Sequence, residues 1–190
     1  MNILTDLLTT DCISVYSPAR NKAEVFTTAG DLFEKRLGIS SNTVVEVLNA
    51  REDRSSTALS SGVAIPHGIV TTLKKPAAAL IKLARPIDFA APDQNKISIL
   101  IFLLFPEIAI PEHLQILSFT AQLLLDYDIR ENLLLEQDPQ KIFELLTFSN
   151  DFDDTHQIAE SRHLLQSIEA SKYNIQSYID EWAMLEVSRR

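Results

Sequence analysis

Cysteine is almost absent from this sequence. Cys12 is the only one among 190 residues, so the chain can form no intrachain disulfide and no cysteine-based zinc site. Its neighbours Ile13 and Val15 are apolar, which favours a small buried side chain rather than a reactive thiol. A single free cysteine is compatible with a reducing compartment, and we expect a cytoplasmic protein.

Long hydrophobic runs are absent as well. The longest, ISILIFLLF, spans Ile97 to Phe105 and falls far short of the ~20 residues that a membrane-spanning helix needs. The first residues carry Asp6 and Asp11 and no basic stretch, unlike a secretory signal peptide. We therefore expect no insertion into a membrane, and we interpret residues 97–105 as a central strand buried on both faces.

Basic residues are outnumbered by acidic ones. The chain has 17 lysines and arginines against 26 aspartates and glutamates, which gives a net charge of -9. An acidic surface repels phosphate backbones, and no lysine- or arginine-rich patch offsets that repulsion. Nucleic acids are therefore not expected as partners.

Strand-like and helix-like patterns alternate over residues 1–149. Apolar runs that favour strands lie at residues 12–16, 63–65, 77–84 and 97–105. Helical spacing and capping residues favour helices at about residues 3–9, 18–37, 42–53, 111–126, 129–137 and 139–149. The helix over 18–37 is predicted to begin at Ser17-Pro18 and to stop at Gly38. This interleaving indicates the α/β class.

The composition changes after residue 149. The acidic stretch NDFDDTHQ is typical of a linker. Beyond it, apolar residues recur at steps of four and three, interrupted by one serine: Leu164, Ile168, Ser171, Ile175, Tyr178, Trp182 and Leu185. We therefore predict a domain over residues 1–149, and a linker with a helical C-terminal extension over residues 150–190. The helix either packs on its own domain or forms a homodimer through this seam.

His67 lies in an unusual local sequence, SSGVAIPHGIV. Pro66 restricts the direction in which the chain leaves the preceding apolar segment, and Gly68 removes a side chain beside the imidazole. Two readings stay open at this point: a hydrogen-bonded structural histidine, or a functional one. His113 also lies near the end of a predicted element, where sites in α/β proteins usually occur.

The loop before His67 is rich in groups that bind anions. It offers hydroxyls at Ser55, Ser56, Thr57, Ser60 and Ser61. Arg51 and Arg54 lie at the end of the preceding predicted helix, and a guanidinium matches the geometry of phosphate oxygens. The loop and the arginines therefore favour a phosphate site beside His67.

Four segments in this order carry a resemblance: SSGVAIPHG, RPIDFAAPD, ISILIFLLFPE and EHLQILS. Together they resemble the EIIA component of the phosphoenolpyruvate-dependent phosphotransferase system. The similarity is to its fructose–mannitol class, which includes the nitrogen-regulatory EIIA proteins, and it covers about residues 1–148. The resemblance implies a mixed β-sheet flanked by helices on both faces, to which the tail would add an extra C-terminal helix.

The same resemblance implies a phosphohistidine carrier without a cofactor or metal. His67 would accept a phosphoryl group from a small HPr-like carrier and pass it to an EIIB domain or a regulatory target. Arg51 matches the family arginine that holds the phosphate, and His113 matches the second active-site histidine. We expect a protonated His113 to help keep His67 neutral. Ser56, Thr57 and Gly68 are predicted to bind the phosphate, with Thr57 on the threonine of the family stretch Ser-Thr-Gly-Ile-Gly-x-Gly.

This chain departs from that stretch, because Ala58 and Ser60 stand where the family has glycine, and only Gly62 is kept. Three functions therefore stay open. We favour a regulatory, nitrogen-type carrier. The others are an EIIA that feeds a separate fructose or mannitol transporter, and an interaction module that is not phosphorylated. The residues alone also allow a zinc hydrolase using His67 and His113, although no familiar ligand spacing supports it.

Overall fold

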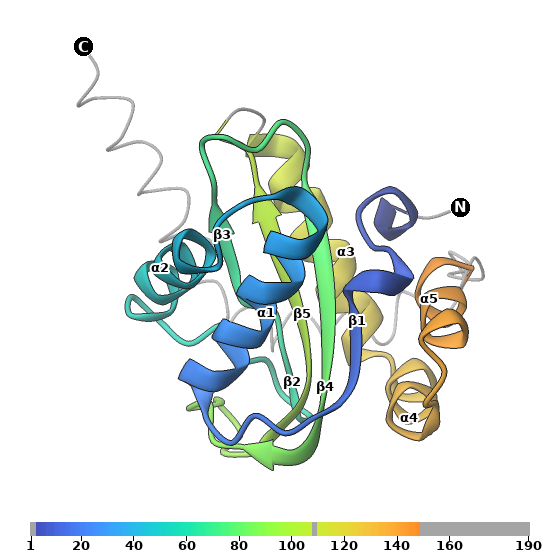
Figure 1. The fold of residues 1–190 in the computed structure, drawn as a ribbon. Coiled ribbons are helices and arrows are strands. Elements are labelled where there is room, and N and C mark those ends of the chain that lie inside the picture. Colours follow the sequence, from blue (N-terminus) through green and yellow to red (C-terminus); the bar gives the residue numbers. More distant parts are fainter. Residues whose placement is uncertain (1–2, 108–109, 149–190) are drawn as a thin grey trace. The chain divides into compact units, whose positions relative to one another are not determined.

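A mixed β-sheet forms the centre of the molecule (Figure 1). The structure is a computed structural model, and it describes residues 3–107 and 110–148. The strands lie in the order β1-β4-β5-β2, and β3 also pairs with β5. Their bounds are β1 Ile13–Ser17, β2 Val63–Ala64, β3 His67–Ile69, β4 Ala77–Ile87 and β5 Ile97–Phe105. β1 is parallel to β4, β4 is antiparallel to β5, and β2 and β3 are parallel to β5.

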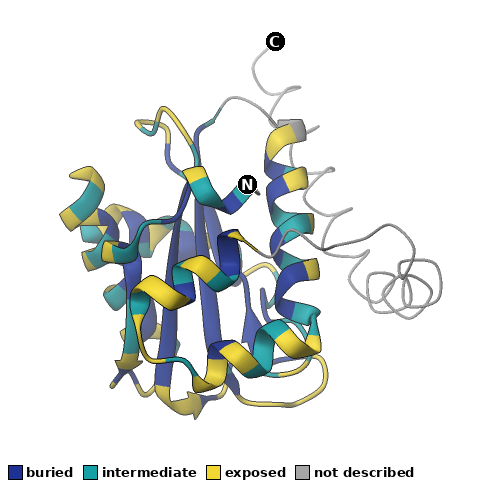
Figure 2. Ribbon diagram, turned by 90° about the vertical axis from the view of Figure 1, so that its right-hand side faces the viewer, coloured by how far each residue is buried: buried dark blue, intermediate teal, exposed yellow. Residues whose placement is uncertain are grey.

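Helices cover both faces of this sheet, as Figures 1 and 2 show. α1 (Lys22–Leu37) and α2 (Ser41–Glu52) lie on one face, and α3 (Ile110–Leu125) lies on the other. α4 (Tyr127–Leu135) and α5 (Pro139–Thr147) follow near the β1 edge. The predicted α/β class, with a mixed sheet between two helical layers, is confirmed.

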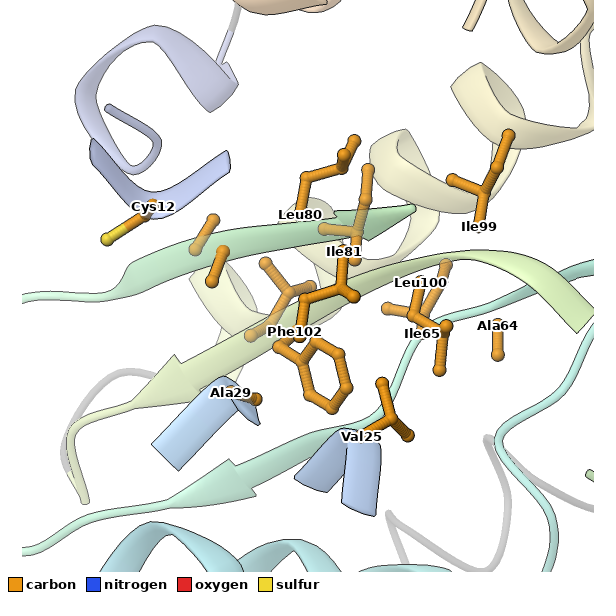
Figure 3. Close-up of a cluster of buried hydrophobic side chains, with 14 of the residues drawn as sticks. Cys12, Val25, Ala29, Ala64, Ile65, Leu80, Ile81, Ile99, Leu100 and Phe102 are labelled. Atoms are coloured by element: carbon orange, nitrogen blue, oxygen red, sulfur yellow. The ribbon is translucent and has the colours of Figure 1, made fainter. Parts of the chain in front are cut away.

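The core lies between the sheet and these helices. β5 is apolar along most of its length because eight of its nine residues are buried, which matches a strand covered on both sides. Phe102 points from β5 toward Val25 and Ala29 of α1 (Figure 3). Cys12 is fully buried, as expected for a small apolar side chain.

The start of α1 differs from the prediction at Ser17-Pro18. Ser17 is the last residue of β1, and the helix is capped by Asn21, whose side chain accepts from Glu24 N at 2.9 Å. The carboxylate of Glu24 accepts in turn from Arg20 N at 2.8 Å. This reciprocal capping satisfies two backbone donors, and Ser17 offers no comparable arrangement.

The predicted C-terminal extension, residues 150–190, lies outside the described residues, and so does any homodimer seam on it. Within the described ranges, no helix is both long enough and apolar enough to cross a membrane.

Lys82 is a buried cation in the middle of β4. Its side chain is 4% exposed, and burial lowers its pKa, opposed by the carboxylate of Glu136. Its ammonium donates to the backbone oxygens of Leu133 at 3.1 Å, Leu134 at 3.2 Å and Glu136. These carbonyls end α4 without helical partners, so Lys82 caps the helix and attaches it to the sheet.

The variant Lys82→Met tests this cap. Methionine keeps most of the apolar stem but leaves three carbonyls at the end of α4 without their donor, so we expect a loss of about 2 kcal/mol in the free energy of unfolding. Urea denaturation measures it. In the control Lys141→Met, an exposed lysine 3.9 Å from Glu136 is lost, and we expect less than about 0.5 kcal/mol. Equal losses in the two variants would contradict the cap.

Candidate functional site

His67 is the first residue of β3, a strand that the sequence analysis did not predict. The sequence placed this histidine just after the apolar segment 63–65, but the residues from His67 onward form a strand of their own that pairs with β5, with His67 opposite Leu103. The amide of Leu103 donates to Pro66 O at 3.0 Å. Three residues are too few to show an alternating pattern, which is why the strand was missed. The pairing holds the backbone of His67, and so fixes the position from which its imidazole extends.

Two hydrogen bonds fix the ring of His67. Its Nδ1 lies 2.8 Å from Ile65 O, and the Nε of Arg51 donates to its Nε2 at 3.0 Å. A guanidinium can only donate, so Nε2 carries the lone pair and Nδ1 carries the hydrogen that goes to Ile65. The ring is thereby held as one tautomer, with its nucleophilic nitrogen facing the arginine.

The imidazole of His67 is strongly held in its neutral form. His67 is buried, with 7% of its surface exposed. Burial lowers the pKa of His67 to about 3, with a further lowering by the Arg51 guanidinium and a smaller one by His113, against a rise from the Ile65 hydrogen bond. At neutral pH the ring therefore needs no deprotonation before it can act as a nucleophile.

Gly68 has a packing role that the sequence analysis did not predict. A Cβ at this position would meet Val47 Cγ2 at 2.9 Å and Val47 Cβ at 3.1 Å, so the missing side chain makes room for α2. Val47 and Arg51 are one helical turn apart and share a face of α2. The close approach at Gly68 is therefore what brings Arg51 over His67.

The loop after α2 uses its hydroxyls to hold itself in place. The hydroxyl of Thr57 donates to Glu52 Oε2 at 2.5 Å, and that of Ser56 donates to Phe89 O at 2.7 Å. Arg51 Nη1 donates to Ser55 O at 3.1 Å. Direct phosphate binding by Ser56 and Thr57 stays a prediction, because in this state both hydroxyls donate elsewhere.

The sequence pattern alone missed one residue of the site, Glu52, and it did not distinguish Arg51 from Arg54 as the guanidinium at His67. Glu52 is a buried carboxylate beside Arg51, and no pattern distinguishes it in sequence from the solvated acidic residues around it. Arg54, the second candidate guanidinium, is exposed, whereas Arg51 lies on the imidazole.

The two lost glycines do not require a special backbone. Among the described residues, positive φ in this loop occurs at Ser61 (65°) and Gly62 (79°), and not at Ala58 or Ser60. Ala58 instead forms an isolated antiparallel bridge with Ala64. The departures from the family stretch therefore fall at positions whose φ any residue can adopt.

His113 lies in the first turn of α3, fully buried beside the ring of Phe105, with the two ring centroids 4.3 Å apart. Neither of its ring nitrogens has a hydrogen-bond partner among the described residues. Burial lowers the pKa of His113 to about 4, so it is neutral at neutral pH. His113 therefore contributes less to keeping His67 neutral than expected, because burial and Arg51 lower the pKa of His67 more than His113 does.

The site thus joins a neutral, oriented nucleophilic nitrogen to a guanidinium. The lone pair of Nε2 can attack an electrophile such as phosphorus, and a guanidinium stabilises the oxygens of a phosphoryl group. Zinc binding through this same nitrogen would have to displace Arg51.

A family model described as "Phosphoenolpyruvate-dependent sugar phosphotransferase system, EIIA 2" matches residues 6–149. The chain belongs to this family. The resemblance found in the sequence is thereby confirmed. A relative of this EIIA chain, a nitrogen regulatory protein from Bradyrhizobium diazoefficiens, is 34% identical over 143 residues, which are 75% of this chain and 94% of that protein.

Solved structures share the EIIA fold. The nitrogen regulatory protein IIA-Ntr from Neisseria meningitidis matches with a TM-score of 0.74 and 35% identity, covering 77% of this chain and 100% of that one. The enzyme IIAMTL from Escherichia coli, solved in complex with phosphorylated enzyme IIBMTL, matches with a TM-score of 0.62. At 21% identity, over 73% of this chain and 96% of the other, this second likeness shows the fold alone.

The variant Gly68→Ala tests whether the α2 approach sets the EIIA site. The new methyl group would press on Val47, so we expect a loss of about 1–3 kcal/mol in the free energy of unfolding. Val47→Ala in the same chain removes the nearest clashing atom. The double variant should therefore lose less than the sum of the two single variants, by about 1 kcal/mol in urea denaturation. Additive losses would show that the two positions do not press on each other.

Proposed function

We propose that this EIIA protein is a phosphohistidine carrier. It accepts a phosphoryl group on His67 Nε2 from an HPr-like carrier protein and passes it to an EIIB domain or a regulatory target. The observation that carries the proposal is the hydrogen bond from Arg51 Nε to a neutral His67 Nε2 at 3.0 Å. The nitrogen that would accept the phosphoryl group and the guanidinium that would stabilise it are thus already in contact before any phosphoryl group arrives.

The transfer needs no net proton. The Nε2 lone pair forms the new bond to phosphorus, the donor's P–N bond breaks, and its electron pair returns to the donor imidazole. Each ring keeps the hydrogen on its other nitrogen. The positive charge that His67 gains on phosphorylation is stabilised by the Ile65 carbonyl, which lies 2.8 Å from Nδ1. No resident metal takes part in this step.

Arg51 has to change partners during the transfer. Its Nε–H now occupies the lone pair that attacks, so the guanidinium moves off the ring and then binds the oxygens of the transferred group. The strong donors of a guanidinium favour the more highly charged oxygens of the transition state. Its contact with Ser55 through Nη1 leaves Nε free to make this exchange.

His113 supplies a second donor in this proposal. Its buried nitrogens lack partners in the described part of the chain, which is costly unless some state of the protein satisfies them. A phosphoryl oxygen on His67 would satisfy one, because a neutral imidazole carries one N–H donor. Ser56, Thr57 and Gly68 would line the phosphate through their backbone, and Ser56 could also exchange its hydroxyl bond.

We favour a regulatory role over sugar transport. The support is the name of the Bradyrhizobium relative, a nitrogen regulatory protein, together with its 34% identity. The ordinary φ values at Ala58 and Ser60 argue against a loop too damaged to be phosphorylated, which was the basis of a pure interaction module. In this proposal the protein turns over no small molecule by itself, works in the cytoplasm, and carries its phosphoryl group on residues 1–149.

Phosphotransfer in vitro tests the proposal. The full chain is incubated with phosphoenolpyruvate, enzyme I and an HPr-like carrier, and we expect acid-labile phosphate on the wild type and none on His67→Ala. His163→Ala, in the C-terminal extension, is the matched control and should label normally. His113→Ala should slow onward transfer about tenfold or more. Labelling that persists without His67 would contradict the assignment.

A further inference from the structure

Next to the site lies a buried carboxylate that the proposed transfer step does not use. Glu52, the last residue of α2, is 7% exposed. Its Oε1 accepts from Lys22 Nζ at 2.7 Å, and its Oε2 accepts from Thr57 N at 3.0 Å and Thr57 Oγ1 at 2.5 Å. Such charge-assisted bonds are strong, and removing a partner would leave the buried charge poorly satisfied.

This carboxylate attaches the loop after α2 to two other parts of the fold. Lys22 comes from the first turn of α1, and its ammonium lies 4.2 Å from the centroid of the Phe89 ring. The backbone oxygen of Phe89, between β4 and β5, accepts from Ser56 Oγ at 2.7 Å. The loop is therefore fixed on α1 through Glu52 and on the β4–β5 connection through Phe89.

The fixed loop in turn holds Arg51. The Nη1 of Arg51 donates to Ser55 O at 3.1 Å and to Ser55 Oγ at 3.4 Å. Ser55 lies in the short segment that the Glu52–Thr57 bonds close at both ends. A guanidinium is planar and rigid, so fixing Nη1 on Ser55 helps to fix the direction of Nε toward His67.

We propose that Glu52 is a positioning residue for phosphoryl transfer at His67. It acts through Thr57 and Ser55 on Arg51 and touches no reacting atom. The inference rests on the proposed carrier function. It assigns the hydroxyl of Thr57 to the carboxylate rather than to the phosphate. During transfer, Nε of Arg51 leaves the imidazole while Nη1 stays bonded to Ser55. The guanidinium then reaches the phosphoryl oxygens from this fixed position.

Thr57→Val is the principal variant, because valine keeps the shape and the amide donor of residue 57 but removes its hydroxyl. Thr57→Ser keeps the hydroxyl and serves as the rescue. Thr147→Val is the matched control, since Thr147 is also buried and donates its hydroxyl at 2.7 Å, but to Phe143 O in α5. Glu52→Gln, which keeps the shape and removes the charge, is a second variant of the same contact.

Two measurements are made on the full chain. The first is the initial rate of labelling by the phosphorylated HPr-like carrier, over a range of carrier concentrations. For Thr57→Val we expect a maximal rate on the order of tenfold lower at an unchanged KM for the carrier, because the guanidinium and not the docking surface is displaced. Thr57→Ser should stay within about twofold of the wild type, and so should Thr147→Val, despite its lost hydroxyl bond.

The second measurement needs no transfer. The Nε–H signal of Arg51 is observed by NMR in the unphosphorylated protein, where a hydrogen bond to an imidazole protects it from exchange with water. We expect protection in the wild type, in Thr57→Ser and in Thr147→Val, and its loss in Thr57→Val and Glu52→Gln.

These outcomes separate the inference from the proposed function. A wild type that takes up no label while Thr57→Val loses the Arg51 signal would support the positioning of Arg51 by Glu52 and end the carrier proposal. A Thr57→Val protein that labels at the wild-type rate and keeps the signal would overturn the positioning role alone. So would a Thr147→Val protein that is slowed as much as Thr57→Val.

Discussion

The hydrogen bond from Arg51 to His67 is the contact on which the rest of the site depends. It places an obligatory donor on Nε2, so the ring hydrogen must lie on Nδ1, where the Ile65 carbonyl accepts it. The same guanidinium adds to the burial that holds the pKa of His67 at about 3. One contact thus sets the tautomer and the direction of the nucleophile, and it adds to the burial that keeps the ring neutral.

The fold supplies this contact from two rigid elements. β3 holds the imidazole through its pairing with β5, and α2 carries the guanidinium. They meet closely because Gly68 presents no side chain to Val47. At the end of α2, the Glu52 carboxylate anchors the following loop. Arg51 is therefore held by Ser55 of that loop as well as by its own helix. Helix packing and the half-buried Lys22–Glu52 ion pair therefore both help to hold Arg51 on His67.

Much of this architecture follows from sequence pattern, because local chemistry decides it. The apolar run of β5, the helical spacing of α2 and the pairing of His67 with Arg51 in one phosphate site all came from residue types and from the resemblance they carry. The strand β3 did not, since three residues are too short to show a period. The packing of Gly68 against α2 was not predicted, and Glu52 was missed. Both depend on contacts between segments distant in sequence, which composition and spacing do not record.

The buried, neutral histidine also links the site to the stability of the fold. The unfolded chain binds a proton at His67 below about pH 6.5, whereas the folded protein does so only near pH 3. Between these values the unfolded state holds more protons, so acid weakens the fold through this residue, and through His113 by the same reasoning. Any change that exposes the ring reduces this penalty, and it also releases the ring from Arg51.

The most direct test of this account is a side-chain ¹⁵N NMR titration of His67, assigned with His67→Gln. The account predicts a neutral ring with its hydrogen on Nδ1 and an unprotonated Nε2, unchanged from neutral pH down to about pH 5. A hydrogen on Nε2, or protonation of the ring near pH 6.5, would contradict it, because Arg51 could then not be donating to the nitrogen that is meant to take up the phosphoryl group.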